Sequence, residues 1–509
     1  MNSTRKSIMN ISILLPLHIL QILINFVAKT VFIRTLGQDY LGINVLFGDI
    51  TTLLSLTELG LNSAIMFSLY RPLNLKDTEK ISAIINYSRT IFNKIALIIT
   101  LAGLAIIPFL KFVVHSELEM PMIIWYYVLY LITVSVTYLA TYKATLISAD
   151  EKNYVVKIYY TVTNGLRAIV QIALLYLTKN FTLYLIAGII FNLIFNFAIS
   201  MKVNKDYPYL NNKARLSPRE RKEMFNNTKA VFKNKIAGLV LNNTDNIIIS
   251  SFLSTLIVGQ YSGYTTLYTT LMGLMGNFYS GIVSTIGKLN TSESSGEKHH
   301  TFNNIHTVIF ILAAVVSICF FLLADDFINL WIGPEYIMST GVLAAIVTNF
   351  YIAVIFYPVE IYKHTTKLFV KIQNIVIITA ITNIVLSIIF VQFFGLPGIL
   401  FATGISKLVT IFWAEPFILF KSYFNSDNND FILYLVKLIM EAAFVVLVIV
   451  LLQYPIGLIP ATTWSQLILK GFICCGTSGV IIMAGLSVSS TYREIMRALF
   501  RTIKNKIKK

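Results

Sequence analysis

The sequence predicts an all-α integral membrane protein with about 14 transmembrane helices, and three observations support this fold class. Of 509 residues, 56% are hydrophobic and only 13% are charged, and the mean hydropathy is +0.72. A soluble domain carries roughly 25% charged residues, so this chain has too few charges to cover a surface that faces water. Apolar segments of about 20 residues, each long enough to cross a hydrocarbon core of roughly 30 Å, recur along the whole chain.

The first apolar segment follows Arg5 and Lys6, is long, and lacks a small-residue cleavage site, so we expect the first span there and not a cleaved signal peptide. The three cysteines all fall in apolar segments, which favours neither a disulfide framework nor a zinc site. The predicted spans are 12–33, 43–69, 91–114, 122–148, 158–178, 182–201, 236–257, 262–287, 305–324, 337–360, 372–393, 396–420, 431–452 and 464–487.

The net charge of +17 is distributed unevenly over the connections between these spans. If the N-terminus is cytoplasmic, the cytoplasmic connections and both termini hold about 32 of the 41 Lys and Arg residues. The opposite connections hold about two, Arg34 and Lys179, and carry acids such as Glu117 and Asp325. This positive-inside asymmetry predicts cytoplasmic termini. Basic residues on the cytoplasmic side also attract anionic membrane lipids, which accounts for the positive net charge. We therefore expect no nucleic-acid partner.

An internal repeat divides the chain into two halves. The pattern Y-x-G-x-x-x-L-[FY] begins at Tyr40 and again at Tyr261, an offset of 221 residues, and the same offset aligns Asn25 with Asn246. Six spans separate the copies, so both halves have the same orientation, as in transporters whose site lies between two repeats. The predicted parts are an N-terminal lobe (1–201, spans one to six), a basic cytoplasmic linker (202–235), a C-terminal lobe (236–420, spans seven to twelve), and two further spans with a basic tail (421–509).

Polar side chains at helical spacing inside the spans give the candidate site. Such groups are expensive in hydrocarbon and should face the bundle interior or a wet cavity. The candidates are Gln21, Asn25 and Lys29 in span one, Glu58 in span two, Lys143 in span four, Asn164 and Arg167 in span five, and Asn242, Asp245 and Asn246 in span seven.

Two interpretations of these residues remain open. Isolated amides and hydroxyls often only fix helix packing through hydrogen bonds, and Glu58 can form a salt bridge with Lys29 or Arg167. The three cations Lys29, Lys143 and Arg167, however, have few acids near them in the sequence, which favours an anionic substrate such as a diphosphate. Asp245 lies among amides, so it is a candidate for coupling transport to Na⁺ or a proton; no metal centre or other cofactor is predicted.

Three segments resemble the motifs of one family. Phe32–Phe47 is similar to the first-loop motif of bacterial polysaccharide (Wzx-type) flippases, and Glu58–Pro72 resembles the segment that follows it. Phe327–Tyr336 resembles the motif between spans nine and ten. These flippases are oligosaccharide-lipid exporters of the multidrug/oligosaccharidyl-lipid/polysaccharide (MOP) superfamily, and the resemblance extends over the whole chain in span number and two-lobe layout.

The resemblance implies a function that composition alone does not. It implies a flippase of the bacterial cytoplasmic membrane that moves undecaprenyl-diphosphate-linked oligosaccharide repeat units outward by alternating access, for capsule or exopolysaccharide synthesis. A polysaccharide polymerase and chain-length regulators would be its partners. Twelve spans would form the core, the last two would make a groove for the lipid tail, and cavity cations would hold the diphosphate.

Two other functions remain open. A multidrug exporter of the same superfamily would handle cationic drugs in an acidic or aromatic cavity, which the basic first half disfavours. A polytopic polymerase or sugar transferase would need catalytic residues on large external loops. The predicted external connections are short and carry few acids, and the sequence has neither a nucleotide-binding glycine-rich loop nor a metal cluster. We therefore expect a transporter, not an enzyme.

Overall fold

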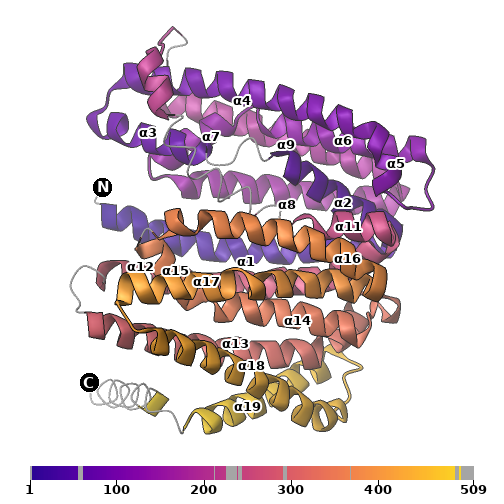
Figure 1. The fold of residues 1–509 in the computed structure, drawn as a ribbon. Helices are drawn as coiled ribbons and strands as arrows, with labels where there is room; N and C mark the ends of the chain where they lie inside the picture. Colours follow the sequence, from indigo (N-terminus) through magenta and orange to yellow (C-terminus); the bar gives the residue numbers. More distant parts are fainter. Residues whose placement is uncertain are drawn as a thin grey trace. The chain divides into compact units, whose positions relative to one another are not determined.

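The computed structural model describes residues 3–55, 61–210, 213–224, 238, 243–289, 295–366, 368–487 and 492–493. Within these ranges the chain is helical and has no β-strand, which confirms the predicted fold class (Figure 1). The chain divides into two compact units, Met1–Gly259 (unit 1) and Gln260–Lys509 (unit 2). The predicted four-part division, with its boundary in the basic linker, stays a prediction.

Unit 1 is a bundle of long helices and shorter helical pieces. The long helix α1 packs along α8, and α4 and α9 both pack against α6. Its helices are α1 (Ser3–Leu36), α2 (Gln38–Leu54), α3 (Leu61–Leu75), α4 (Thr78–Ile106), α5 (Leu110–Val113), α6 (Met120–Thr137), α7 (Thr141–Ala149), α8 (Asn153–Thr178), α9 (Phe181–Asp206) and α11 (Asp245–Phe252). A 3₁₀ turn at Ile107–Phe109 joins α4 to α5.

One predicted span of unit 1 is interrupted in the structure. The segment 122–148 is two helices, α6 and α7, with a break between Thr137 and Thr141. Helix breaks at membrane depth need other donors for the carbonyls they release. Here Asn196 of α9 donates from Nδ2 to the Val136 carbonyl at 2.6 Å. The break is therefore satisfied by a neighbouring helix.

The segments around the first motif meet at one end of unit 1. A Cβ on Gly42 would lie 1.8 Å from the Thr255 carbonyl oxygen, and one on Gly259 would lie 2.0 Å from that of Gln38. Only glycine permits this approach of α2 to the start of α12 (Thr255–Leu289). Asp39 accepts hydrogen bonds from Ser116 and Thr255 at the same place. The first copy of the repeated motif therefore serves close helix packing.

Unit 2 holds the rest of α12 and the remaining helices. Its α13 packs against α14, α18 and α19, so this helix is the centre of the unit. The helices are α13 (Ser295–Trp331), α14 (Thr340–Ile355), α15 (Tyr357–Thr365), α16 (Phe369–Val409), α17 (Ile411–Leu419), α18 (Asn428–Gly457) and α19 (Trp464–Leu486), with a 3₁₀ turn at Pro334–Tyr336 and a π-helical turn, η4, at Phe420–Phe424.

The helix α16 contains a reversal, so its two halves correspond to two predicted spans. Gly395 adopts φ +60°, a left-handed conformation that favours glycine. The halves then lie side by side, because Asn383 donates to the Thr403 hydroxyl at 2.9 Å and the hydroxyls of Thr379 and Thr410 are 2.7 Å apart. The boundary between the predicted spans 372–393 and 396–420 thus falls at this turn.

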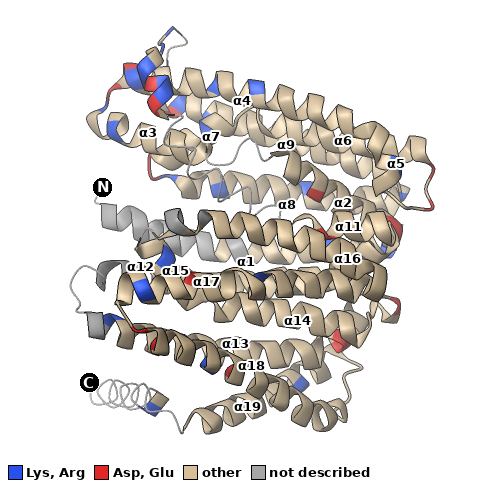
Figure 2. Cartoon of the chain, viewed as in Figure 1, with Lys and Arg blue, Asp and Glu red and all other residues tan. Residues whose placement is uncertain are grey.

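Eight helical stretches among the described residues are long and apolar enough to cross a membrane. The helices α1, α8 and α12 are also long, with 34, 26 and 35 residues. Figure 2 shows mainly uncharged residues along the long helices and a gathering of Lys, Arg, Asp and Glu near α3 and the start of α4. The eight stretches are Thr78–Val113, Met120–Thr137, Phe181–Asp206, Lys298–Trp331, Thr340–Thr365, Asn374–Phe424, Asn428–Gly457 and Trp464–Leu486.

Candidate functional site

The predicted polar residues of α1 and α8 lie on two helices that pack together in unit 1. On α1, Gln21 donates from Nε2 to Asn25 Oδ1 at 2.8 Å, and Lys29 follows one turn later. The two helices approach closely at Gly165, where a Cβ would lie 3.4 Å from Ile24 Cδ1. The structure thus brings together two stripes that are about 140 residues apart in the sequence.

Arg167 on α8 lies in an aromatic and polar surrounding. Its Nε is buried and has no hydrogen-bond partner among the described residues. The guanidinium interacts electrostatically with the hydroxyl groups of Tyr130 on α6 and Tyr184 on α9. The Tyr184 ring is 5.1 Å from that of Phe32, which lies one turn beyond Lys29 on α1. Arg167 and the end of α1 therefore share one neighbour, Tyr184.

The Arg167 surrounding is further ordered by amides. On α8, Asn164 is buried, and Gln171 donates from Nε2 to the Tyr184 carbonyl at 2.9 Å. Tyr130 donates its hydroxyl to the side chain and carbonyl of Asn44 on α2. Four helices, α2, α6, α8 and α9, thus hold the groups around the guanidinium, and none of the named neighbours is a carboxylate.

Lys143 has a different surrounding. It lies on α7, where Arg89 of the neighbouring α4 acts on it electrostatically. Two residues further along α7, Thr145 donates to Asn62 Oδ1 at 3.0 Å. Two cations near each other are unfavourable without a counter-charge, so this pair also suits an anion. The structure therefore gives Lys143 the companion Arg89, which the sequence did not indicate.

The predicted residues of span seven are described in part. Asn246, in the first turn of α11, donates from Nδ2 to Asp49 Oδ2 of α2 at 2.6 Å, and Asp245 is its neighbour in the chain. The sequence analysis did not name Asp49 as a candidate site residue, although an acidic residue inside an apolar segment is a signal that could have identified it. Glu58 and Asn242 lie outside the described residues.

The buried charges of unit 2 form ion pairs between helices. Lys363 Nζ lies 2.7 Å from Glu360 Oε1 and 3.0 Å from Glu415 Oε2. Near the two ends of α13, His306 Nε2 is 2.8 Å from Glu441 Oε2, and Asp326 Oδ2 is 2.6 Å from Lys470 Nζ. The partners on different helices are 52 to 144 residues apart, so helical spacing alone could not reveal them, whereas Glu360 and Lys363 are neighbours on α15.

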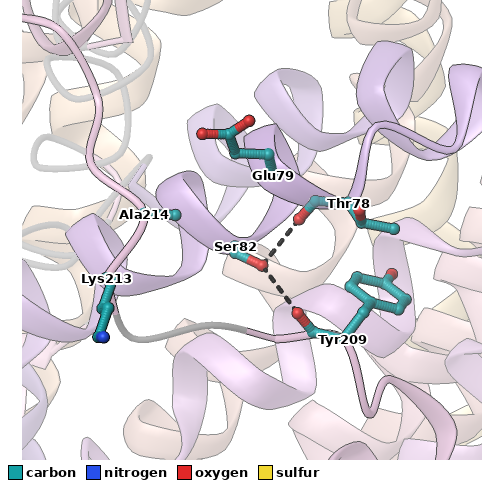
Figure 3. Close-up of a pocket in the computed structure, with 6 residues that line it drawn as sticks. All are labelled: Thr78, Glu79, Ser82, Tyr209, Lys213 and Ala214. Carbon is teal, nitrogen blue, oxygen red and sulfur yellow. Dashed lines mark hydrogen bonds between the residues drawn. The ribbon is translucent and has the colours of Figure 1, made fainter.

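A polar pocket of about 350 Å³ lies at the start of α4 in unit 1 (Figure 3). Ser82 donates its hydroxyl to the Thr78 carbonyl at 2.7 Å, and its distance to the Tyr209 carbonyl is 3.5 Å. Burial and the nearby Asp150 carboxylate raise the pKa of Tyr209. None of the predicted site residues lines this pocket, which is bounded by Thr78, Glu79, Ser82, Tyr209, Lys213 and Ala214.

The fold and the buried charges define a class, a multi-span helical membrane protein with ionisable groups between its helices. No protein family profile matches the sequence, and no curated protein is similar to it in sequence.

Several solved structures share the fold of this chain. The lipid II flippase MurJ in an inward closed conformation has a TM-score of 0.69 and 15% identity, covering 93% of this chain and 99% of that protein. An inward-facing multidrug resistance MATE transporter of the MOP superfamily has a TM-score of 0.61 and 14% identity, covering 77% of this chain and 93% of that protein.

A third structure, a MATE transporter of Vibrio cholerae, has a TM-score of 0.54 and 13% identity, covering 84% of this chain and 98% of that protein. At these identities the similarity concerns the fold. The chain shares its fold with these solved transporters, which confirms the predicted fold class, whereas the superfamily named from the sequence motifs stays a prediction.

Proposed function

We propose that this chain is a flippase that carries undecaprenyl-diphosphate-linked oligosaccharide repeat units across the bacterial cytoplasmic membrane, with both termini cytoplasmic. The observation that carries the proposal is Arg167, a guanidinium on a membrane helix whose named neighbours are tyrosines and amides. Because charge inside a membrane is costly, a cation with such neighbours is expected to serve a function. A diphosphate would supply the negative charge that none of these described neighbours carries.

The proposed mechanism is alternating access. Lys143 with Arg89 would bind one anionic headgroup position, and Arg167 with Lys29 a second one further along the helices. The polar side chains of α1 and α8 would hydrogen-bond the sugars, while the lipid tail stays in the bilayer. We further propose Asp245, or the neighbouring Asp49–Asn246 pair, as the place where Na⁺ or a proton acts as the coupling ion.

A multidrug exporter is the second candidate, because Asp49 and Asp245 are carboxylates that could attract a cationic drug. The extent of the structural similarity favours the flippase. The MurJ structure covers 93% of this chain, whereas the first MATE transporter covers 77%. The MurJ structure therefore matches a larger share of this chain than either MATE structure described above, of which the second covers 84%.

Gene deletion in the host tests the function. We expect surface polysaccharide to be lost while lipid-linked repeat units accumulate inside, protected from an added external glycosidase. Intact units that reach the outer face but stay unpolymerised would instead identify a polymerase. Normal polysaccharide together with new sensitivity to cationic drugs would identify a multidrug exporter.

Charge removal tests the site. A hydrogen bond to a charged group contributes about 1.5–3 kcal/mol, so Arg167→Ala should lower the export rate roughly 10- to 100-fold. Lys143→Ala and Lys29→Ala should act in the same direction. Lys94→Ala, an exposed lysine of α4, is the matched control. If all three site variants export polymer normally at normal protein levels, these cations do not bind the substrate.

A further inference from the structure

The ion pair between His306 and Glu441 lies in a fully buried polar cluster between α13, α14 and α18. The His306 side chain is 0% exposed, that of Glu441 is 9% exposed, and Nε2 lies 2.8 Å from Oε2. The rings of Phe302 and Tyr434 cover the imidazole, with centroid distances of 6.4 and 5.4 Å. The pair is therefore held in place by packing as well as by its hydrogen bond.

Three polar atoms of this cluster have no hydrogen-bond partner among the described residues. They are Nδ1 of His306 and the hydroxyls of Tyr351 on α14 and Tyr434 on α18, all buried. Both tyrosines interact electrostatically with Glu441 and with each other. Buried polar groups in folded proteins nearly always have partners, so these atoms indicate a function beyond holding α18 against α13.

The groups that face the imidazole come from two of the helices packed on α13. Helix α14 contributes Tyr351, while α18 contributes Tyr434, Glu441 and Lys437, whose Nζ is 3.8 Å from Glu441 Oε1. On other described elements that pack on α13, charged groups have partners of their own: Lys470 of α19 is bonded to Asp326, Lys363 of α15 to Glu360 and Glu415, and Lys421 of η4 lies over the Phe417 ring.

We propose that His306, Glu441, Tyr351 and Tyr434 form a proton-binding site inside unit 2. With one proton on Nε2, the neutral imidazole donates to the Glu441 carboxylate. A second proton, taken from water, binds Nδ1 and gives an imidazolium–carboxylate pair, in a cluster whose two tyrosine hydroxyls have no other partner among the described residues. Neither state breaks the 2.8 Å contact, so the proton can be bound and released without separating α13 from α18.

The side chain of Lys437 connects this site to the exterior of the unit. It is 39% exposed and lies near Glu441, whereas His306 itself is covered. The sequence resemblance places α18 outside the twelve-span core, and this site shares no residue with the substrate cations proposed in unit 1. Use of the bound proton to drive transport rests on the proposed function, but proton binding itself can be measured without any substrate.

The test is a histidine titration on the purified full-length chain in lipid nanodiscs. The protein is labelled with ¹³C at histidine Cε1, and the resonance of His306 among the six histidines is assigned by its loss in His306→Gln. We expect the His306 resonance to titrate reversibly between about pH 5 and 8, the range where histidine changes charge. Glu441→Gln should move this titration to lower pH, because the carboxylate that stabilises the imidazolium is lost.

A second variant covers the case in which Glu441→Gln does not fold. Tyr434→Phe keeps the ring that packs on His306 and removes only the hydroxyl, so we expect a smaller shift in the same direction. The control is Glu223→Gln. Glu223 is exposed and pairs with Arg219, so this change should leave the His306 titration unchanged. A His306 resonance that does not titrate in this range, or one that Tyr434→Phe and Glu441→Gln leave unmoved, overturns the proposal, whatever the deletion strain shows about transport.

Discussion

Replacing Lys363 by Met removes an ammonium that two carboxylates of unit 2 share. Lys363 Nζ lies 2.7 Å from Glu360 and 3.0 and 3.3 Å from the two oxygens of Glu415. The Glu415 side chain is 0% exposed and that of Lys363 12% exposed, so water cannot replace the lost cation. At 3 Å and an effective dielectric constant of about 20, each attraction is roughly 5 kcal/mol. Removing one partner of a buried pair costs about 3–5 kcal/mol because the other charge stays uncompensated.

The assay is thermal unfolding of the purified protein in detergent, followed by intrinsic fluorescence. Lys363→Met should lower the apparent Tm far more than Lys205→Met, an exposed lysine at the end of α9. Adding Glu415→Gln to Lys363→Met should recover a large part of the loss, because the neutral amide no longer needs a cation. If Lys363→Met is no more destabilising than the control, or Glu415→Gln gives no recovery, the three groups do not form the charge network described above.

Two further predictions concern packing and pH in unit 1. Gly42→Ala should destabilise the protein by about 3 kcal/mol, the upper end for overpacking, because the added Cβ would overlap the Thr255 carbonyl. The control is Gly48→Ala, whose Cβ meets nothing within 4 Å and which should leave stability unchanged. Equal unfolding temperatures for the two variants would contradict this prediction. Burial and the hydrogen bond to Asp150 raise the pKa of Tyr207 above its usual value. The folded state thus holds the phenolic proton more tightly than the unfolded state, so this stabilisation is present below about pH 10 and is lost at higher pH. Tyr207→Phe should weaken the loss of stability in an alkaline titration; an unchanged profile would contradict the assignment.

The fold could be predicted from the sequence because apolar length and spacing determine where helices cross a membrane. Even the reversal at Gly395 was visible as a boundary between two apolar segments. The break between Thr137 and Thr141 was not, because it depends on Asn196 of another helix, which donates a hydrogen bond to the Val136 carbonyl. A local pattern carries no information about a partner 60 residues away.

The candidate site was predicted as a set of residues but not as an arrangement. The stripes on α1 and α8 follow from helical spacing, and the packing of these two helices brings them together. The companions of the cations, Arg89 beside Lys143 and the tyrosines beside Arg167, come from helices whose neighbours the sequence does not specify. His306 was not among the predicted site residues because its partner, Glu441, lies on another helix. A single histidine in an apolar segment does not by itself indicate a site.

The described buried charges have different kinds of neighbours in the two units. This difference bears on how transport would be driven. In unit 2, Lys363, His306 and Lys470 each contact a carboxylate within 3.0 Å, so their charges are compensated inside the protein. In unit 1, Arg167 meets hydroxyl groups and Lys143 meets another cation. Compensated pairs can exchange protons without a large change in electrostatic energy, whereas cations beside neutral or like-charged groups gain most from an incoming anion. An anionic substrate is therefore expected to bind to unit 1, and the His306–Glu441 pair of unit 2 offers a proton site in addition to the coupling-ion site proposed at Asp245 and Asp49.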